Sequence, residues 1–182
     1  YSNDTATASL RGPLSGNRKD QGATSSASFG YVTGGPAVVD RIDYANDTAA
    51  TAPKGPLSAA KYRLSAVGNV DFGYFGGGQP TNSTVERLDY SNDTVMASPK
   101  GQLTSTKRQL SATGNADFGY FTMGGGDSVN RVDYSNDTAT ALEKGDVTNG
   151  KDSGSASSTT HGYFGGGAPG LSSVGRLDYS ND

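Results

Sequence analysis

The chain of 182 residues contains no cysteine and no tryptophan, and it has a single histidine. Without cysteine it can form neither a disulfide framework nor a cysteine-ligated metal site, and one histidine cannot build a multi-histidine site. Long apolar runs are missing as well, since no stretch approaches the roughly 20 residues that a membrane-spanning helix needs. The sequence therefore predicts no membrane insertion and no bound cofactor.

Aliphatic side chains are also scarce. Hydrophobic residues make up 32% of the chain, and 27 residues are glycine, so a thick hydrophobic core is not available. Low hydrophobicity indicates disorder mainly when the net charge is high, whereas here 15 basic and 18 acidic residues give a formal charge of −3. This balance leaves no basic stripe for phosphates, which predicts that the chain does not bind nucleic acid.

Two phrases recur at a fixed distance along the chain. The phrase Arg-Leu-Asp-Tyr-Ser-Asn-Asp-Thr at 87–94 has near-copies at 41–48, 131–138 and 176–182. The phrase Phe-Gly-Tyr-Phe-Gly-Gly-Gly at 72–78 has counterparts at 29–35, 118–126 and 161–167. Cutting before each recurring tyrosine divides one domain, 1–182, into the repeats 1–43, 44–89, 90–133 and 134–178. A period of about 45 residues is typical of solenoids, propellers and arrays.

Each repeat has the pattern of four short strands and almost no helix. In the second repeat we expect a hairpin turn at Gly68 and Asn69, and we expect Pro99 to end the last strand. The four expected strands are 62–67, 72–75, 84–90 and 94–98, and the last of them lies beyond residue 89, where this repeat was cut.

The third strand of each repeat is constrained on both faces. Side chains alternate along a strand, so Val85 and Arg87 lie on one face and Leu88 on the other, and all three columns recur in the other repeats. A strand packed on both faces belongs to a small sheet between neighbouring sheets. Blades arranged face to face around an axis supply that environment, so the sequence predicts an all-β propeller.

The order of these features resembles the kelch repeat. It has a hairpin turn at 68–69, an aromatic strand ending in glycines at 74–78, the pair Asp89-Tyr90, and a crossover with proline and a basic residue at 99–107. The sequence of the repeat also resembles long repeat arrays in proteins of marine phages and plankton. These resemblances imply a kelch-like β-propeller of four-stranded antiparallel blades with a structural or adhesive role.

Closure of the propeller has two readings that the sequence leaves open. Residues 172–182 supply one spare third strand, which could complete the first blade and close a four-bladed ring. Alternatively, Tyr179 to Asp182 begin a fifth repeat, and the chain is a segment of a longer array.

Charged residues recur in two columns. We expect the first column to form an arginine–aspartate ladder between blades, with a ring of anion or sugar sites as the alternative; it consists of Arg41, Asp43, Arg87, Asp89, Arg131, Asp133, Arg176 and Asp178. The second column lies in the crossovers and is expected to be exposed; it consists of Arg18, Lys61, Lys107 and Lys151.

Asparagine and aspartate cluster in the turns. Five asparagines fit the N-glycosylation pattern, but turn formation is the favoured explanation of these triplets; they are Asn3, Asn46, Asn82, Asn92 and Asn136. Asp89, Asn92 and Asp93 could also hold calcium, but their spacing does not match a calcium loop.

No nucleophile and base recur around His161, so we expect a protein without enzymatic activity. The leading hypothesis is a structural or adhesive module, extracellular or virion-associated, that meets a glycan, a surface protein or copies of itself. The alternative is a propeller lectin with one sugar site per blade. Contact residues are expected in the variable loops after the glycine runs, namely Pro36, Gln79, Pro80, Thr81, Asn82, Asp127 and Pro169.

Overall fold

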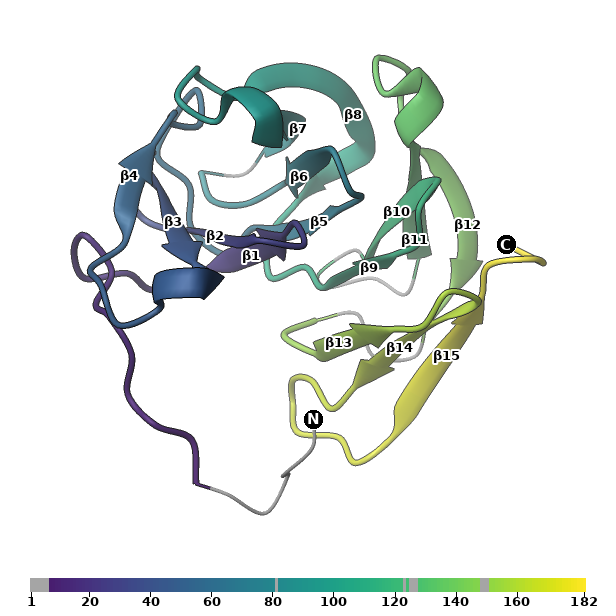
Figure 1. Ribbon diagram of the computed structural model, residues 1–182. Coiled ribbons are helices and arrows are strands. Elements are labelled where there is room, and N and C mark those ends of the chain that lie inside the picture. Colours follow the sequence, from purple (N-terminus) through teal and green to yellow (C-terminus); the bar gives the residue numbers. More distant parts are fainter. Residues whose placement is uncertain (1–6, 81, 123, 125–127, 148–150) are drawn as a thin grey trace.

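Four small antiparallel sheets follow one another along the chain and form a ring, a four-bladed β-propeller (Figure 1). The computed structural model describes residues 7–80, 82–122, 124, 128–147 and 151–182. Blade 1 contains β1 (Gly22–Ser25), β2 (Phe29–Thr33), β3 (Val39–Asp43) and β4 (Ala52–Lys54). Blade 2 contains β5 (Ser65–Gly68), β6 (Phe72–Gly76), β7 (Asn82–Asp89) and β8 (Ser98–Lys107). The predicted all-β propeller is confirmed.

The other two blades have the same strand order. Blade 3 contains β9 (Ala112–Gly114), β10 (Phe118–Thr122), β11 (Ser128–Asp133) and β12 (Leu142–Asp146). Blade 4 contains β13 (Gly154–Ser157), β14 (His161–Gly165) and β15 (Val174–Asp178), and its sheet has three strands within the described residues. The first strand of every blade lines a common central hollow of 660 Å³. The first strand is therefore the innermost of each blade.

The predicted hairpin between the first two strands of blade 2 is confirmed. Val67 pairs with Tyr74, and Gly68 pairs with Gly73. The Asn69 side chain closes the turn, because its Oδ1 accepts the backbone N–H groups of Asp71 and Phe72 at 3.0 and 2.9 Å. Such a side-chain bond to the following backbone is the reason that asparagine suits this turn.

The fourth strand begins later than the sequence predicts. Three-residue 3₁₀ turns follow the third strands of the first three blades: η1 (Tyr44–Asn46), η2 (Tyr90–Asn92) and η3 (Tyr134–Asn136). In blade 2 the fourth strand then starts at Ser98, and Pro99 pairs with Glu86, so the prediction of a strand at 94–98 ended by Pro99 is wrong. Proline is tolerated here because β8 is the outermost strand, whose free edge needs no N–H donor.

The core is divided among the junctions between blades. At the first junction Tyr31 of blade 1 packs in one cluster with Phe75 and Leu88 of blade 2, and these side chains are 0%, 1% and 1% exposed. Val85, on the opposite face of β7 from Leu88, is buried toward blade 3. The prediction that the third strand is packed on both faces is therefore confirmed.

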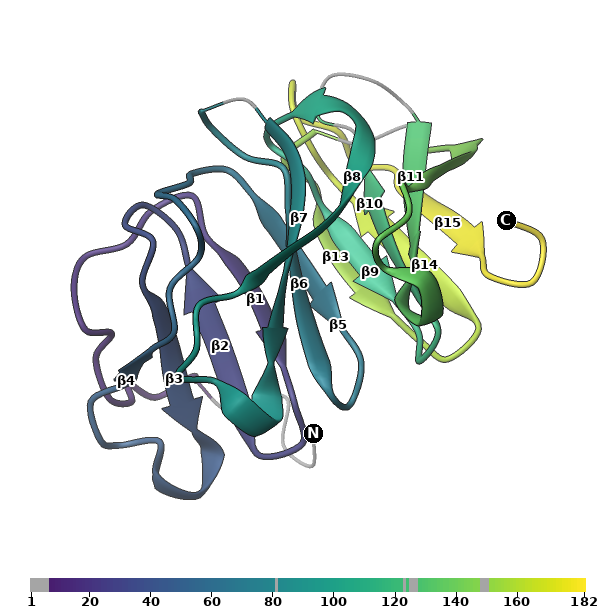
Figure 2. The same ribbon diagram turned by 90° about the horizontal axis from the view of Figure 1, so that it is seen from above.

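The last segment of the chain belongs to blade 4. Residues Val174 to Asp178 pair with β14 along its whole length, while blade 1 has four strands of its own. Of the two alternatives for closure, the one in which residues 172–182 complete the first blade is wrong, because each third strand follows its second strand directly and pairs with that sequence neighbour. Blades 1 and 4 are the first and last blades of the ring and lie on either side of its open part, with blades 2 and 3 between them along the chain (Figure 2).

Within the described residues, no helix has the length and apolar character needed to cross a membrane.

Candidate functional site

A cluster of charged and aromatic side chains joins each of the first three blades to the next. Between blades 2 and 3, the carboxylate of Asp137 accepts a hydrogen bond from the Tyr74 hydroxyl at 3.1 Å and one from Arg87 at 2.7 Å. Lys100 lies 3.6 Å from the other carboxylate oxygen. Tyr134 stacks on Tyr74 with ring centroids 4.6 Å apart. We call this arrangement the inter-blade cluster.

The inter-blade cluster is repeated at the other two junctions. Between blades 1 and 2 it consists of Tyr31, Arg41, Lys54, Tyr90 and Asp93. Between blades 3 and 4 it consists of Tyr120, Arg131, Lys144, Tyr179 and Asp182. Each arginine also stacks on the phenylalanine that begins the second strand of its blade, at 4.2 to 4.3 Å from the ring centroid. Most of the recurring aromatic and charged residues therefore hold blades together.

Burial and the neighbouring carboxylate keep the cluster tyrosines protonated. Desolvation, followed by the charge of Asp93, raises the pKa of Tyr31 well above its ordinary value of 10.0. Tyr74 and Tyr120 have their pKa values raised for the same reasons, by burial first and then by Asp137 or Asp182. A tyrosine that stays neutral continues to donate its hydroxyl hydrogen bond to the carboxylate.

The predicted arginine–aspartate ladder names the wrong aspartates. Arg41, Arg87 and Arg131 do reach the next blade, but each binds the aspartate of the Asn-Asp turn there, which lies four residues after the predicted aspartate of that blade. The predicted aspartates instead cap the turns: the carboxylate of Asp89, for example, accepts the N–H of Ser91 at 2.9 Å. The same capping is seen at Asp43, Asp133 and Asp178. Spacing along one strand could not reveal a partner supplied by another blade.

The sequence predicts that the second basic column is exposed. For Arg18 and Lys61 this prediction is wrong. Arg18 pairs with Asp40 at 2.8 Å, with side chains 4% and 0% exposed. Lys61 pairs with Glu86, and these side chains are also 4% and 0% exposed. The repeats carried a signal for this pairing: the acidic column holds Asp40 and Glu86 in blades 1 and 2, but Asn130 in blade 3, where the amide oxygen accepts the N–H of Thr104 instead.

Three equivalent grooves lie at the hairpin ends of the blades, one at each junction. The groove between blades 1 and 2 has a volume of 450 Å³ and is lined by residues 26–29, 70–72 and 89–91. The groove between blades 2 and 3 has 420 Å³ and is lined by 69, 72, 116–118 and 133–135. The groove between blades 3 and 4 has 460 Å³ and is lined by 114–117 and 157–159. We call these the junction grooves.

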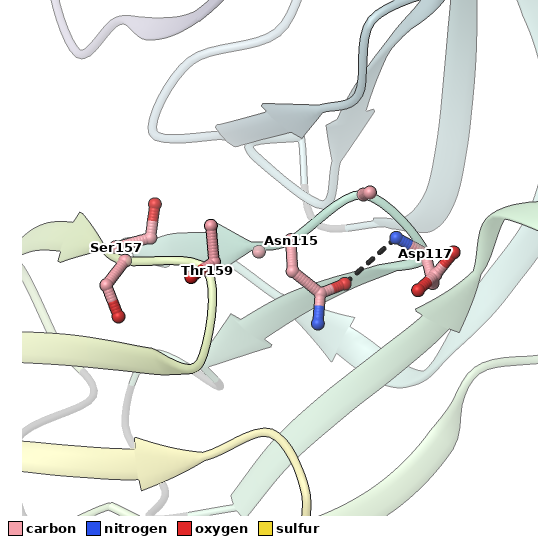
Figure 3. A pocket seen from close by; sticks show the side chains of 7 residues that line it. Asn115, Asp117, Ser157 and Thr159 are labelled. Atoms are coloured by element: carbon pink, nitrogen blue, oxygen red, sulfur yellow. Dashed lines mark hydrogen bonds between the residues drawn. The ribbon is translucent and has the colours of Figure 1, made fainter.

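Polar groups with fixed positions line the third junction groove (Figure 3). The Asn115 Oδ1 accepts the N–H groups of Asp117 and Phe118, both at 2.9 Å, which leaves its amide N–H₂ free to donate. Across the groove lie Ser157 and Thr159, both exposed. An amide, a carboxylate and hydroxyls around a shallow hollow can exchange several hydrogen bonds with a polyhydroxyl ligand or a polar loop.

The predicted contact residues lie at the other end of the strands from the junction grooves. Pro36 and Pro169 are exposed, in the loops after β2 and β14. Gln79 uses its backbone to pair with Tyr62, and Asn82 is half-buried, with its amide donating to the Pro80 carbonyl. Thr81 and Asp127 lie outside the described residues. The sequence missed the junction grooves because each is assembled from the turns of two different repeats.

The proposed calcium ligands are engaged in other contacts. Asp93 binds Tyr31, Arg41 and Lys54, and Asp89 caps its turn. Within the described residues, no group of three histidine, aspartate or glutamate side chains is placed to hold a metal ion.

The glycosylation candidates differ in exposure. Asn46, Asn92 and Asn136 are exposed on the 3₁₀ turns, whereas Asn82 is half-buried. Asn3 lies outside the described residues. Modification of the exposed asparagines stays a prediction.

His161 takes the place that phenylalanine has in the other blades. Its Nδ1 lies 2.8 Å from the Thr160 hydroxyl, and its Nε2 lies 3.7 Å from the carboxylate of Asp178. Asp178 also accepts hydrogen bonds from the N–H and the hydroxyl of Ser180. These contacts join the hairpin of blade 4 to the turn after β15.

No protein-family model matches the chain, and no curated protein is similar to it. The geometry described above therefore carries the functional argument.

Proposed function

We propose that this chain is a non-enzymatic β-propeller module with a structural and adhesive role, extracellular or virion-associated, which meets glycans or a surface protein. The observation that carries the proposal is the use of the recurring residues. The recurring tyrosine, arginine, lysine and aspartate residues that define the repeat bind one another in the inter-blade clusters. The resemblance of the repeat to kelch-like and phage arrays points the same way.

The junction grooves are the part of this module best suited to recognition. They are polar, shallow and repeated at a fixed interval, and neighbouring blades supply their two walls. Repeated weak sites on one rigid body gain strength when several are engaged together. An adhesive module can therefore hold a surface without a deep pocket.

A binding screen with groove and loop variants tests the adhesive role. The chain is applied to a glycan array and to immobilised surface proteins, together with Asp117→Ala and Ser157→Ala in the third groove. Pro36→Ala and Pro169→Ala, at the opposite end, form the matched set. Loss of binding in the groove set supports the grooves, and loss in the loop set places recognition at the loops. Silence of the unmodified chain on all surfaces would count against adhesion.

The second candidate is a lectin with one sugar site per blade junction. It is favoured by the asparagine whose amide is held in place in the turn, which occurs both as Asn69 and as Asn115. Calorimetric titration with a sugar that the array identifies measures the stoichiometry. One sugar bound for each junction groove supports the lectin, whereas a single site per chain contradicts it.

A further inference from the structure

Every junction between blades has two different halves. The preceding blade supplies a front face, with the tyrosine of its second strand and the valine and arginine of its third strand; in blade 1 these are Tyr31, Val39 and Arg41. The following blade supplies a rear face, with an aromatic residue, an aliphatic residue and the Tyr-x-x-Asp turn; in blade 2 these are Phe75, Leu88, Tyr90 and Asp93.

Blade 4 has a front face that is left uncovered. Val174 is 65% exposed, although Val85 at the same position of blade 2 is 1% exposed. Tyr163 is 36% exposed, against 0% for Tyr74. In the described part of the chain Arg176 has neither a carboxylate partner nor a tyrosine pair beside it.

Blade 1 has a rear face that is also left uncovered. Val32 and Ile42 are only half-buried, whereas the residues at the corresponding positions of the other three blades are buried. Tyr44 is 49% exposed and stacks on no ring within the described residues. Asp47 holds the position of Asp93 and Asp137, but among the described residues its carboxylate pairs with Arg11 alone, on the surface.

Residues 11–13 lie along this rear face as an outer segment. The Gly12 N–H donates to the Asp47 carbonyl at 2.8 Å, as the Gly55 N–H donates to the Asp93 carbonyl at 2.7 Å. The Thr51 N–H donates to the Pro13 carbonyl, which repeats the bond from Ala97 to Pro56. At the first two inner junctions the donor glycine directly follows the fourth strand of the preceding blade (Gly55) or lies within it (Gly101). Residues 11–13 thus stand where a preceding blade would place its fourth strand, and blade 4 is the blade that lacks one in the described structure.

We propose that the front face of blade 4 binds the rear face of blade 1 of a second copy of this chain, so that copies join head to tail. Asp47 of one copy would meet Tyr163 and Arg176 of the next, and Tyr44 would stack on Tyr163. Arg11 would complete the cluster in the role of Lys54, and its segment would lie along β15. The contact repeats a junction that the chain already forms three times.

A second copy fits better than closure within one chain. The three inner junctions hold blades 1 and 4 apart, on either side of the open part of the ring (Figures 1 and 2). A second copy can dock without disturbing an inner junction. The two faces of the contact differ, so the contact is heterologous and gives rings of copies or filaments. This inference deepens the proposed structural role and rests on it, but it uses none of the junction grooves.

Two charge reversals, one on each face, provide the test. Sedimentation of the unmodified chain over a range of concentrations is expected to show masses rising in steps of the 18.6 kDa chain. Asp47→Arg blocks the rear face and Arg176→Asp blocks the front face, so each variant alone should remain a monomer. An equimolar mixture retains one intact pair of faces, and in the other pair the two charges are exchanged but still opposite, so the mixture should assemble again although neither variant does so alone. Asp117→Arg, in a groove, should assemble as the unmodified chain does.

Other outcomes would overturn the proposal. If the unmodified chain stays at 18.6 kDa at all concentrations, no second copy binds. If the mixed variants stay monomeric although each keeps the circular dichroism and unfolding midpoint of the unmodified chain, the two faces are not partners. If the chain binds a surface but does not assemble, the adhesive role stands and the assembly proposal fails. If the chain assembles but binds no surface, the assembly proposal stands and the adhesive role fails.

Discussion

Tyr74 and Asp137 are 63 positions apart in the sequence, yet the tyrosine hydroxyl donates to the carboxylate at 3.1 Å across the junction of blades 2 and 3. Hydrogen bonds to charged groups contribute about 1.5–3 kcal/mol when they are buried. We expect Tyr74→Phe to lower the free energy of unfolding by about that amount, since the ring still fits and only the hydroxyl is lost. Urea denaturation measures the change.

Tyr163→Phe is the matched control, because Tyr163 holds the same strand position in blade 4, and its hydroxyl has no hydrogen-bond partner among the described residues. At a concentration where the chain is monomeric, its unfolding curve should coincide with that of the unmodified chain. Equal losses in the two variants would show that the hydroxyl of Tyr74 has no special role.

The buried pair of Lys61 and Glu86 gives a larger effect. Glu86→Gln leaves the Lys61 ammonium, 4% exposed, without its counter-charge. Breaking a buried pair from one side typically costs about 3–5 kcal/mol. The double change Lys61→Met with Glu86→Leu removes both charges and should recover most of the lost stability. Denaturation of the three proteins checks this, and a double variant no more stable than Glu86→Gln would contradict it.

Glycine at the end of the second strand lets two blades approach closely. A Cβ on Gly76 would lie 2.7 Å from the Phe121 ring, whereas one on Gly165, the equivalent position in blade 4, would meet nothing nearer than 3.6 Å. Gly76→Ala should therefore lower the thermal midpoint, at a cost of about 1–3 kcal/mol from overpacking. Gly165→Ala should leave it unchanged. A harmless Gly76→Ala would mean that the junction can widen freely.

Alkaline pH should unfold the propeller through its tyrosines. Burial raises the pKa of Tyr90 to about 12, and burial with a nearby carboxylate raises those of Tyr31, Tyr74 and Tyr120 above the ordinary value of 10.0. Above pH 10 the unfolded chain loses these protons while the folded chain keeps them, so stability is complete below pH 10 and falls as the pH rises. Each protected tyrosine costs about 1.4 kcal/mol per pH unit in that range.

Absorbance of tyrosinate, followed together with circular dichroism from pH 9 to 13, measures this effect. Part of the tyrosinate signal should appear in the same step as the loss of sheet structure. Ionisation of all tyrosines before any loss of structure would contradict the assignment of protected hydroxyls.

The sequence was sufficient for the features that depend on neighbours in the chain. The hairpin at Asn69 follows from a side chain that bonds the backbone two and three residues ahead. The doubly packed third strand follows from alternation, because Val85 and Leu88 recur on opposite faces. The start of the fourth strand was missed because an edge strand tolerates Pro99.

The junction grooves and the partner of each arginine could not be predicted in the same way. Arg87 has an aspartate two residues ahead in its own strand, but its carboxylate partner is Asp137, 50 residues away. The basic column at Lys61 appeared exposed because its partner Glu86 belongs to a column that varies between repeats. Each of these contacts depends on how two elements approach one another.

The sequence by itself determined the number of repeats, the hairpin between the first two strands and the two buried faces of the third strand, because these depend on periodicity and local turn chemistry. Only the tertiary structure decided which aspartate meets which arginine, where the grooves lie and which faces at the two ends stay uncovered. The physical reason is that a junction joins side chains from different repeats, and their pairing is set by the packing of whole sheets.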